Sequence, residues 1–279
     1  GGTFPGGALI FHGTNEYLGW AATLNHPDLC DVFKLTMHPK DKNKYLFDGE
    51  WYELEERKKK VKVKILGFLR IPIGKKFYWS KYGSTIKTKE GYYAIRYPAG
   101  FDIRSTETMY KLNKAKSFDD FKAALEEQHL PGINLIYADR EDNIYFVSNG
   151  MFPYRDSNYD WTQVLPGDTS ATLWEPVWHP FEEIPKYENP ESGYLFNTNA
   201  QVYNATGAGE NLKPEDINPT FGYKTYDNNR SIRSRKLIER YDKIDYEDFK
   251  TIKYDRKLDT AMYTYALENM SYFREIDPE

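Results

Sequence analysis

Short runs of residues that are apolar, or that alternate between hydrophobic and polar, predict that much of this chain forms β-strands. Alternation with a period of two places every second side chain on the same face of a sheet, so that one face is buried and the other is wet. The runs that fit are, in chain order, 8–11, 18–24, 31–37, 57–66, 133–138, 144–148 and 193–196. Residues 45–52 are expected to form a hairpin that turns at Asp48-Gly49, since Asp-Gly is a favoured two-residue turn.

Three segments carry the signals of helices instead. Residues 117–127 begin with Ser117, a good N-cap, and the acidic residues that follow suit the positive end of the helix dipole. Residues 230–241 are a second predicted helix, and 245–253 are a third, with Asp245 as its cap. Strands in consecutive runs, with helices placed irregularly among them, favour an α+β fold over a parallel α/β fold.

The strand predicted at 57–66 is unusual because its alternating residues are lysine on one side and valine or isoleucine on the other. One functional interpretation is a site for a polyanion. A solvated or edge strand guarded by lysines is the plainer interpretation, and the sequence favours it.

Composition and charge exclude some classes of partner. With 40% hydrophobic and 29% charged residues, the chain has the composition of a folded protein. With a net charge of −4, the chain lacks the overall excess of basic residues that binds nucleic acid. No apolar run approaches the roughly 20 residues that cross a bilayer. We therefore expect neither a nucleic-acid partner nor a membrane partner.

The most suggestive local cluster follows the predicted strand 18–24, where His26, Asp28, Cys30 and Asp31 stand close together. Zinc would use the histidine, the cysteine and an acid, but the paired spacing of zinc sites is missing. Calcium prefers carboxylates and carbonyl oxygens, which suits the two aspartates better. A turn whose aspartates bind backbone amides explains the same residues without a metal, and local reasoning favours it.

Two further candidates have an ordinary structural explanation. Cys30 has no activating partner nearby in the sequence, and a lone cysteine is more often a small buried residue than a nucleophile. Asn197 and Asn199 follow a predicted strand, where asparagine more often forms a turn than supplies an oxyanion donor. Local patterns alone leave the function open.

The order of the segments resembles the penicillin acylase family of N-terminal nucleophile hydrolases. A Trp strand leads to Asp28 and Asp31, as it does in the family's calcium-binding Asp-x-x-Asp segment. Paired strands then precede a turn at 152–155 that is similar to the family's Tyr-Pro-x-Arg, and a helix bears Arg230. The most specific block is Asn189-Pro-Glu-Ser-Gly-Tyr-Leu-Phe-Asn-Thr-Asn199, which is close to the family's Asn-Pro-x-Ser-Gly-Tyr…Asn-x-Asn.

The resemblance implies a fold and a mechanism. Residues 1–279 would be an incomplete large-chain domain of the αββα four-layer sandwich, with antiparallel sheets and peripheral helices. A precursor would cleave itself and expose a serine at the start of the large chain. That serine would be the nucleophile, with its own α-amine as the base, because the amine's pKa of about 8 lies close to working pH. The implied activity is cleavage of N-acyl amide bonds.

The resemblance also assigns roles to single residues. The side-chain amide of Asn199 would be one oxyanion donor and the backbone N–H of Leu24 the other, while Arg230 would orient the site and assist processing. Ala22 and Thr23 would help line the acyl pocket. A structural calcium ion would be held by Asp28, Asp31, Glu210 and the carbonyls of Cys30 and Pro153.

Gly1 departs from the family pattern, because it has no side chain and cannot be the nucleophile. The chain is therefore expected to be an internal piece of the large chain, inactive alone. Its partners would be an N-acyl small-molecule substrate, the small chain and the remaining large-chain segments of the same precursor. Members of the family act on β-lactam antibiotics, acyl-homoserine lactones and cyclic lipopeptides, and most are periplasmic or secreted bacterial proteins.

Two other functions remain open at this point. The 24 Tyr and six Trp residues could form a stacking platform for glycans or a partner protein, with calcium as a structural support. A degenerate acylase relative, kept as a partner-binding protein, is the second alternative. The residues preceding Gly1 would discriminate, since an acylase needs a cleavage junction before a serine.

Overall fold

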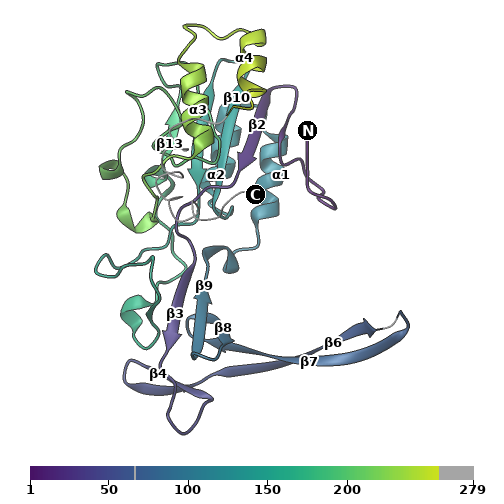
Figure 1. Ribbon diagram of the computed structural model, residues 1–279, viewed down its shortest axis with the longest axis vertical. Coiled ribbons are helices and arrows are strands. Elements are labelled where there is room, and N and C mark those ends of the chain that lie inside the picture. Colours follow the sequence, from purple (N-terminus) through teal and green to yellow (C-terminus); the bar gives the residue numbers. More distant parts are fainter. Residues whose placement is uncertain (66, 258–279) are drawn as a thin grey trace, which may run out of the picture.

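Two β-sheets organise the fold, and each supports a hydrophobic core of its own (Figure 1). The structure is a computed structural model that describes residues 1–65 and 67–257. The two sheets lie in separate lobes along the long axis of the molecule and are not stacked on each other. Almost every strand pair is antiparallel and the helices are few, which confirms the predicted α+β class.

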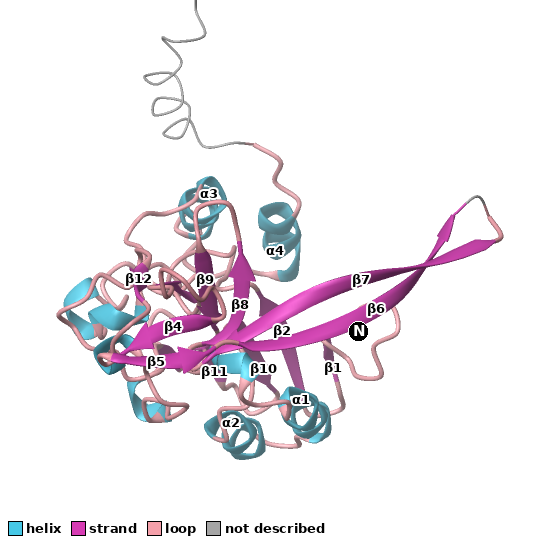
Figure 2. Ribbon diagram, turned by 90° about the horizontal axis from the view of Figure 1, so that it is seen from below, coloured by secondary structure: helices cyan, strands magenta, loops and turns pink. Residues whose placement is uncertain are grey.

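The first lobe is a sheet with helices on both faces (Figure 2). Its strands, in spatial order, are β1 (Gly13–Thr14), β2 (Leu18–Thr23), β10 (Ile133–Asp139), β11 (Ile144–Asn149) and β13 (Lys186–Glu188). One face is covered by α1 (Ser105–Lys114) and α2 (Phe118–Glu126). On the other side lie α3 (Asn229–Ile238) and α4 (Tyr246–Lys253).

The alternation predicted for β2 accounts for the packing of α1 and α2. Trp20 and Ala22 point to the same face and are 5% and 2% exposed. In β10 they lie opposite Tyr137 and Leu135, so four buried side chains form one apolar patch. The ring of Phe121 in α2 lies 4.7 Å from that of Tyr137, which seats the helix on this patch.

Local capping signals placed two of the three predicted helices correctly. Ser117 Oγ accepts a hydrogen bond from the backbone N–H of Asp120 at 3.1 Å, and α2 follows. Asp245 Oδ1 accepts one from Asp248 at 2.9 Å and caps α4. The predicted helix 230–241 is α3, which ends three residues earlier than expected. No helix in the described ranges is long and apolar enough to span a membrane.

The strand predicted at 8–11 is wrong, and the reason lies in α1, a helix that the sequence did not reveal. Asn113 in α1 accepts a hydrogen bond from the N–H of Ile10 at 2.8 Å and donates one to its carbonyl at 2.9 Å. At Ile10 a side chain thus takes the place of a neighbouring strand, while Phe11 donates to the carbonyl of Gly2. Since no side chain caps the start of α1 at Arg104, this helix lacks the signal that reveals α2 and α4.

The strand predicted at 193–196 is also wrong. This segment begins with a left-handed glycine, Gly193, with φ of 71°. Phe196 N–H donates to the carbonyl of Ala205, and Thr206 Oγ1 donates to that of Tyr194, so the segment pairs with a loop. The apolar residues that suggested a strand belong to an ordered loop, in which Phe196 is buried.

The second lobe contains a six-stranded sheet whose strands, in spatial order, are β12 (Leu165–Pro166), β3 (Asp31–Leu35), β9 (Tyr92–Arg96), β8 (Gly83–Lys87), β7 (Leu69–Ser80) and β6 (Glu55–Ile65). The pair of β12 and β3 is parallel. Beside this sheet, β4 (Lys44–Phe47) and β5 (Glu50–Glu53) form the predicted hairpin. Its turn residues Asp48 and Gly49 both have positive φ, as a type I′ turn requires.

Short 3-10 helices lie in the loops at Pro98–Gly100, Ser170–Thr172, Phe181–Glu183, Pro214–Asp216 and Pro219–Phe221.

Aromatic residues fill both cores. Tyr145 in the first lobe, and Tyr45 and Tyr82 in the second, are among the most completely buried side chains. The rings of Tyr82 and Phe33 lie 4.5 Å apart. The aromatic content therefore serves packing first, which weakens the alternative of a surface stacking platform.

The segment just before α1 contains an ion pair with a predicted pH signature. The Arg104 guanidinium donates to both carboxylate oxygens and lowers the pKa of Asp102 from 3.8 to about 2. Because the folded-state pKa is depressed, this stabilisation is full above pH 4 and is lost as the pH falls through 2. We expect Asp102→Asn to cost about 1 kcal/mol of unfolding free energy at pH 6. Urea unfolding at several pH values checks this, and a cost that does not shrink between pH 4 and pH 2 would contradict it.

Candidate functional site

Asn199, Leu24 and Arg230 meet at one point. Asn199 Nδ2 donates to the carbonyl of Leu24 at 2.9 Å, across 175 residues of sequence. Arg230, in the first turn of α3, donates from Nη2 to Asn199 Oδ1 at 2.8 Å. The cation therefore fixes the orientation of the amide, with its oxygen toward Arg230 and its N–H groups toward Leu24. The structure brings together all three residues predicted to act in catalysis.

Asn197 holds the loop that carries Asn199. Its Oδ1 accepts hydrogen bonds from the backbone N–H of Asn199 at 3.0 Å and from Thr23 Oγ1 at 2.5 Å. Asn199 itself has φ of 58°, a left-handed conformation that asparagine adopts more readily than most residues. The two asparagines of the Asn-x-Asn block thus have different roles: Asn197 stabilises the turn, and Asn199 presents its side-chain amide.

Asn228 couples this loop to α3, and sequence reasoning missed it. Its Nδ2 donates to the carbonyls of Thr198 and Asn199, both at 3.1 Å. Its Oδ1 accepts from the N–H of Ser231 at 3.0 Å and caps the helix that bears Arg230. An asparagine two residues before a predicted helix is a capping signal that could have identified it.

A polar cavity of about 670 Å³ adjoins these residues. Its lining includes Asn25, His26, Asp28, Asn199, Tyr223 and Asn228. The buried Asn25 donates to the carbonyl of Asn149 at 2.9 Å, and Tyr223 donates to Ser148 Oγ at 2.8 Å, so hydrogen bonds to β11 fix this wall. A cavity of this size, with a few fixed polar groups, suits a small-molecule ligand.

Of residues 22–24, Ala22 belongs to the core, and Thr23 and Leu24 lie beside the candidate site. Ala22 lies inside the first core and faces α1 and α2, so its predicted part in an acyl pocket has no support from its position. The hydroxyl of Thr23 is bonded to Asn197, which places that residue beside the candidate site. The side chain of Leu24 is 64% exposed, which agrees with a role carried by its backbone.

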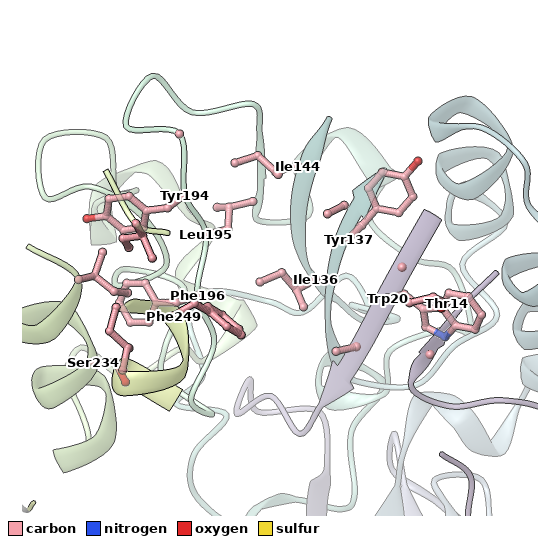
Figure 3. Close-up of a pocket in the computed structure, with 18 residues that line it drawn as sticks. Thr14, Trp20, Ile136, Tyr137, Ile144, Tyr194, Leu195, Phe196, Ser234 and Phe249 are labelled. Atoms are coloured by element: carbon pink, nitrogen blue, oxygen red, sulfur yellow. The ribbon is translucent and has the colours of Figure 1, made fainter. Parts of the chain in front are cut away.

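A second cavity, of about 580 Å³, has an apolar lining and lies between the first sheet and the helices α3 and α4 (Figure 3). Ile136 and Ile144 face it from the strands, while Leu195, Phe196 and Phe249 face it from the opposite side. Its lining includes both the segment 193–196, wrongly predicted as a strand, and residues of α4.

Asp31 occupies the centre of a buried ion pair. Its two carboxylate oxygens accept hydrogen bonds from Arg155 Nη2 at 3.0 and 2.9 Å, and Oδ2 also accepts from the indole N–H of Trp174 at 2.6 Å. Burial raises the pKa of the Asp31 carboxyl, and the nearby Arg155 cation opposes this shift. Arg155 also donates to the carbonyl of Asp28 at 2.6 Å. This arginine therefore organises the segment between the two aspartates.

The other predicted calcium ligands do not complete a site around Asp31. Cys30 is exposed, contrary to our expectation of a buried residue, and its thiol pKa is raised by desolvation and by Asp31. Pro153 is buried two residues before Arg155. The Glu210 carboxylate accepts from the backbone N–H groups of Glu191 and Ser192 at 2.5 and 2.9 Å.

Among residues 1–65 and 67–257 there is no group of three or more His, Cys, Asp or Glu side chains that could hold a metal ion. With one aspartate paired to arginine and the glutamate bound to amides, these side chains do not fit a calcium cage as they stand. The calcium ion implied by the family resemblance stays a prediction.

The chain is similar in sequence to known proteins. Residues 1–270 match the family model for penicillin amidase. Penicillin G acylase of Escherichia coli is 29% identical over 196 residues, which cover 70% of this chain and 22% of that protein. The acyl-homoserine lactone acylase PvdQ of Pseudomonas putida is 23% identical over 233 residues, covering 75% of this chain and 30% of that protein.

A solved structure shows the same fold. It is that of the thermostable penicillin G acylase from Alcaligenes faecalis, with a TM-score of 0.75 and 22% identity, covering 97% of this chain and 47% of that one. The chain thus spans about half of this relative's chain and less than a third of the two curated relatives. Since the family model matches nearly every residue, the chain belongs to the penicillin amidase family.

Proposed function

We propose that this chain supplies the oxyanion-binding part of an acylase that cleaves N-acyl amide bonds. The observation that carries the proposal is the convergence of the Asn199 amide, the backbone at Leu24 and the Arg230 guanidinium beside a polar cavity. Both curated relatives described above are acylases by name, one of penicillin G and one of acyl-homoserine lactones.

The chemistry needs preorganised donors. Attack on an amide carbonyl turns its oxygen into an oxyanion, which hydrogen bonds stabilise most when they are fixed in advance. Asn199 Nδ2 carries two protons, one of which is bonded to the Leu24 carbonyl, so the second can meet the oxyanion. The Leu24 N–H is the proposed second donor. Arg230 positions the amide through Oδ1, and Asn197 positions the backbone that carries it.

The nucleophile is a further part of the proposal. We propose that it is an N-terminal serine of the complete protein, as in the mechanism that the family resemblance implies. Its α-amine would take the hydroxyl proton and pass it to the leaving amine, and water would then release the acyl group. The proposed assembly includes the small chain and the remaining large-chain segments of one precursor, outside the cytoplasm.

The test of this function uses the complete protein that contains this chain. Intact-mass measurement is expected to show a large chain that starts with serine, and an amine-release assay with N-acyl substrates is expected to show hydrolysis. Full hydrolytic activity in a chain that remains uncleaved would refute the N-terminal nucleophile. Absence of hydrolysis, together with binding to immobilised glycans, would favour the alternative of a binding module.

Asn228 gives a test of how the site is positioned. Asn228→Asp keeps an oxygen that can cap α3 but removes the N–H donors to the carbonyls of Thr198 and Asn199. We expect this variant to lose about tenfold in kcat with KM nearly unchanged, because the Asn199 loop loses its tether. Its thermal midpoint should stay closer to wild type than that of Asn228→Ala, which also loses the cap. Equal activity in wild type and Asn228→Asp would remove Asn228 from the positioning of the site.

A further inference from the structure

The strands β6 and β7 form an arm, residues 55–80, that projects from the second lobe (Figures 1 and 2). The register sets Val61 opposite Ile73 and Val63 opposite Ile71. Directly opposed residues of an antiparallel pair share a face, and alternate residues occupy the other face. The register therefore shows which residues lie on each of the two faces of the arm.

One face of the outer arm is apolar and exposed. It consists of Val61, Val63, Ile65, Leu69, Ile71 and Ile73, whose side chains are between 37% and 63% exposed. Phe68, at the tip, is 80% exposed. The sequence predicted a strand with one wet face, and in the structure no other described part of the chain covers the aliphatic face either. Six contiguous aliphatic residues in water are unusual for a free surface and typical of an interaction site.

The opposite face is cationic. It carries Lys60, Lys62, Lys64 and Arg70, for which the described residues provide no ion-pair partner, whereas Lys58 and Lys76 nearer the base share Glu56. The arm contains nine Lys or Arg and two Glu, a net charge of +7, in a chain whose net charge is −4. The rest of the chain therefore carries −11, and the positive charge is concentrated on this projection.

We propose that the arm docks on an anionic lipid surface. Its aliphatic face would enter the boundary of the acyl chains, and its cations would lie at the depth of the lipid phosphates. Amphipathic elements with an apolar face and a lysine-rich face bind membranes in this way, without spanning them. The expectation of no membrane partner was drawn from the length of apolar runs, which detects spanning segments alone.

Charge and strand geometry favour lipid over a protein surface. Two arms packed through their aliphatic faces would each carry a net charge of +7, and the outward cationic faces would remain without counter-charges. β6 is the outer strand of its sheet, and lysines that alternate along an edge strand hinder the addition of another strand. A soluble polyanion would satisfy the cations but leave the aliphatic face in water, whereas an anionic bilayer satisfies both faces.

The experiment is flotation of the complete protein with phosphatidylcholine vesicles, with and without phosphatidylglycerol. We expect binding to the anionic vesicles alone, weakened by salt. Lys60→Gln/Lys62→Gln/Lys64→Gln should lower the binding constant roughly 100-fold, at about fivefold per lysine. Val63→Ser/Ile71→Ser should lower it about tenfold or more. Matched controls on exposed residues elsewhere, Lys40→Gln/Lys42→Gln/Lys89→Gln and Val164→Ser/Val177→Ser, should bind as wild type does.

Four results would overturn the proposal: no vesicle binding, equal binding to neutral vesicles, equal loss in the control variants, or wild-type binding by Val63→Ser/Ile71→Ser. Sedimentation velocity adds a further check, because a dimer that this last variant abolishes would assign the aliphatic face to a second copy. The substituted side chains are exposed on a projection, so unchanged circular dichroism and thermal midpoints are expected for every variant.

Discussion

Asn199→Ala in the complete protein is expected to lower kcat about 100- to 1000-fold, which corresponds to roughly 3 kcal/mol of transition-state stabilisation. The reason is that Asn199 presents an amide whose orientation is already fixed by Arg230 and whose loop is fixed by Asn197. A donor that acts on charge developing in the transition state should change kcat and kcat/KM by the same factor.

Steady-state kinetics with an N-acyl substrate checks this expectation. Asn158→Ala, an exposed asparagine in the second lobe, is the matched control and should change kcat less than twofold. If Asn199→Ala turned over substrate at a near-normal rate, the amide would have no part in stabilising the oxyanion. A change in KM alone would assign it to ground-state binding of substrate instead.

Arg155→Met is expected to destabilise the protein by about 3–5 kcal/mol, the largest stability effect we predict. Asp31 is fully buried, and Arg155 is the cation that pairs with its carboxylate. Without the guanidinium, the carboxylate keeps only a neutral donor, the Trp174 indole. Arg57→Met, which breaks an exposed pair with Glu55, should cost no more than about 1 kcal/mol.

The same variant has a pH signature that separates lost charge pairing from lost packing. Burial already raises the pKa of Asp31, and removal of Arg155 raises it further. A raised folded-state pKa means that the folded protein holds the proton more tightly than the unfolded chain, so the defect of Arg155→Met should shrink as the pH falls from 7 toward 4.

Asp31→Asn in the Arg155→Met background should restore part of the stability at pH 7, because a neutral side chain then replaces the unpaired carboxylate. Denaturant unfolding of the single and double variants measures this. A defect that is constant with pH, and that Asp31→Asn does not relieve, would mean that Arg155 stabilises the fold by packing alone.

Local chemistry predicted the elements whose boundaries depend on a few neighbouring residues. Ser117 and Asp245 cap α2 and α4, and Asp48-Gly49 forms its turn, because each acts within three residues of itself. The segment 8–11 has apolar residues, but its Ile10 bonds to Asn113, about 100 residues away, and its Phe11 donates to the carbonyl of Gly2. A periodic pattern reports which face is buried and not which group pairs with the backbone.

The candidate site followed from the resemblance and not from local patterns. Asn199 at a predicted strand end read as a turn former, and it does form a left-handed turn; its contact with Leu24 depends on a separation of 175 residues. Asn228 was missed although its capping role is local, because its second role, binding the carbonyls of residues 198 and 199, is tertiary. The aliphatic face of the arm was missed because alternation shows two faces without showing what covers them.

The measurement that tests the proposed site most directly is a crystal structure of the complete enzyme with a boronic acid that mimics the tetrahedral intermediate. We predict that one boronate oxygen lies about 2.7–3.1 Å from Asn199 Nδ2 and from the backbone nitrogen of Leu24, with Arg230 still bonded to Asn199 Oδ1. A boronate bound elsewhere, or one whose oxygens are held by other donors while Asn199 points away, would contradict the assignment.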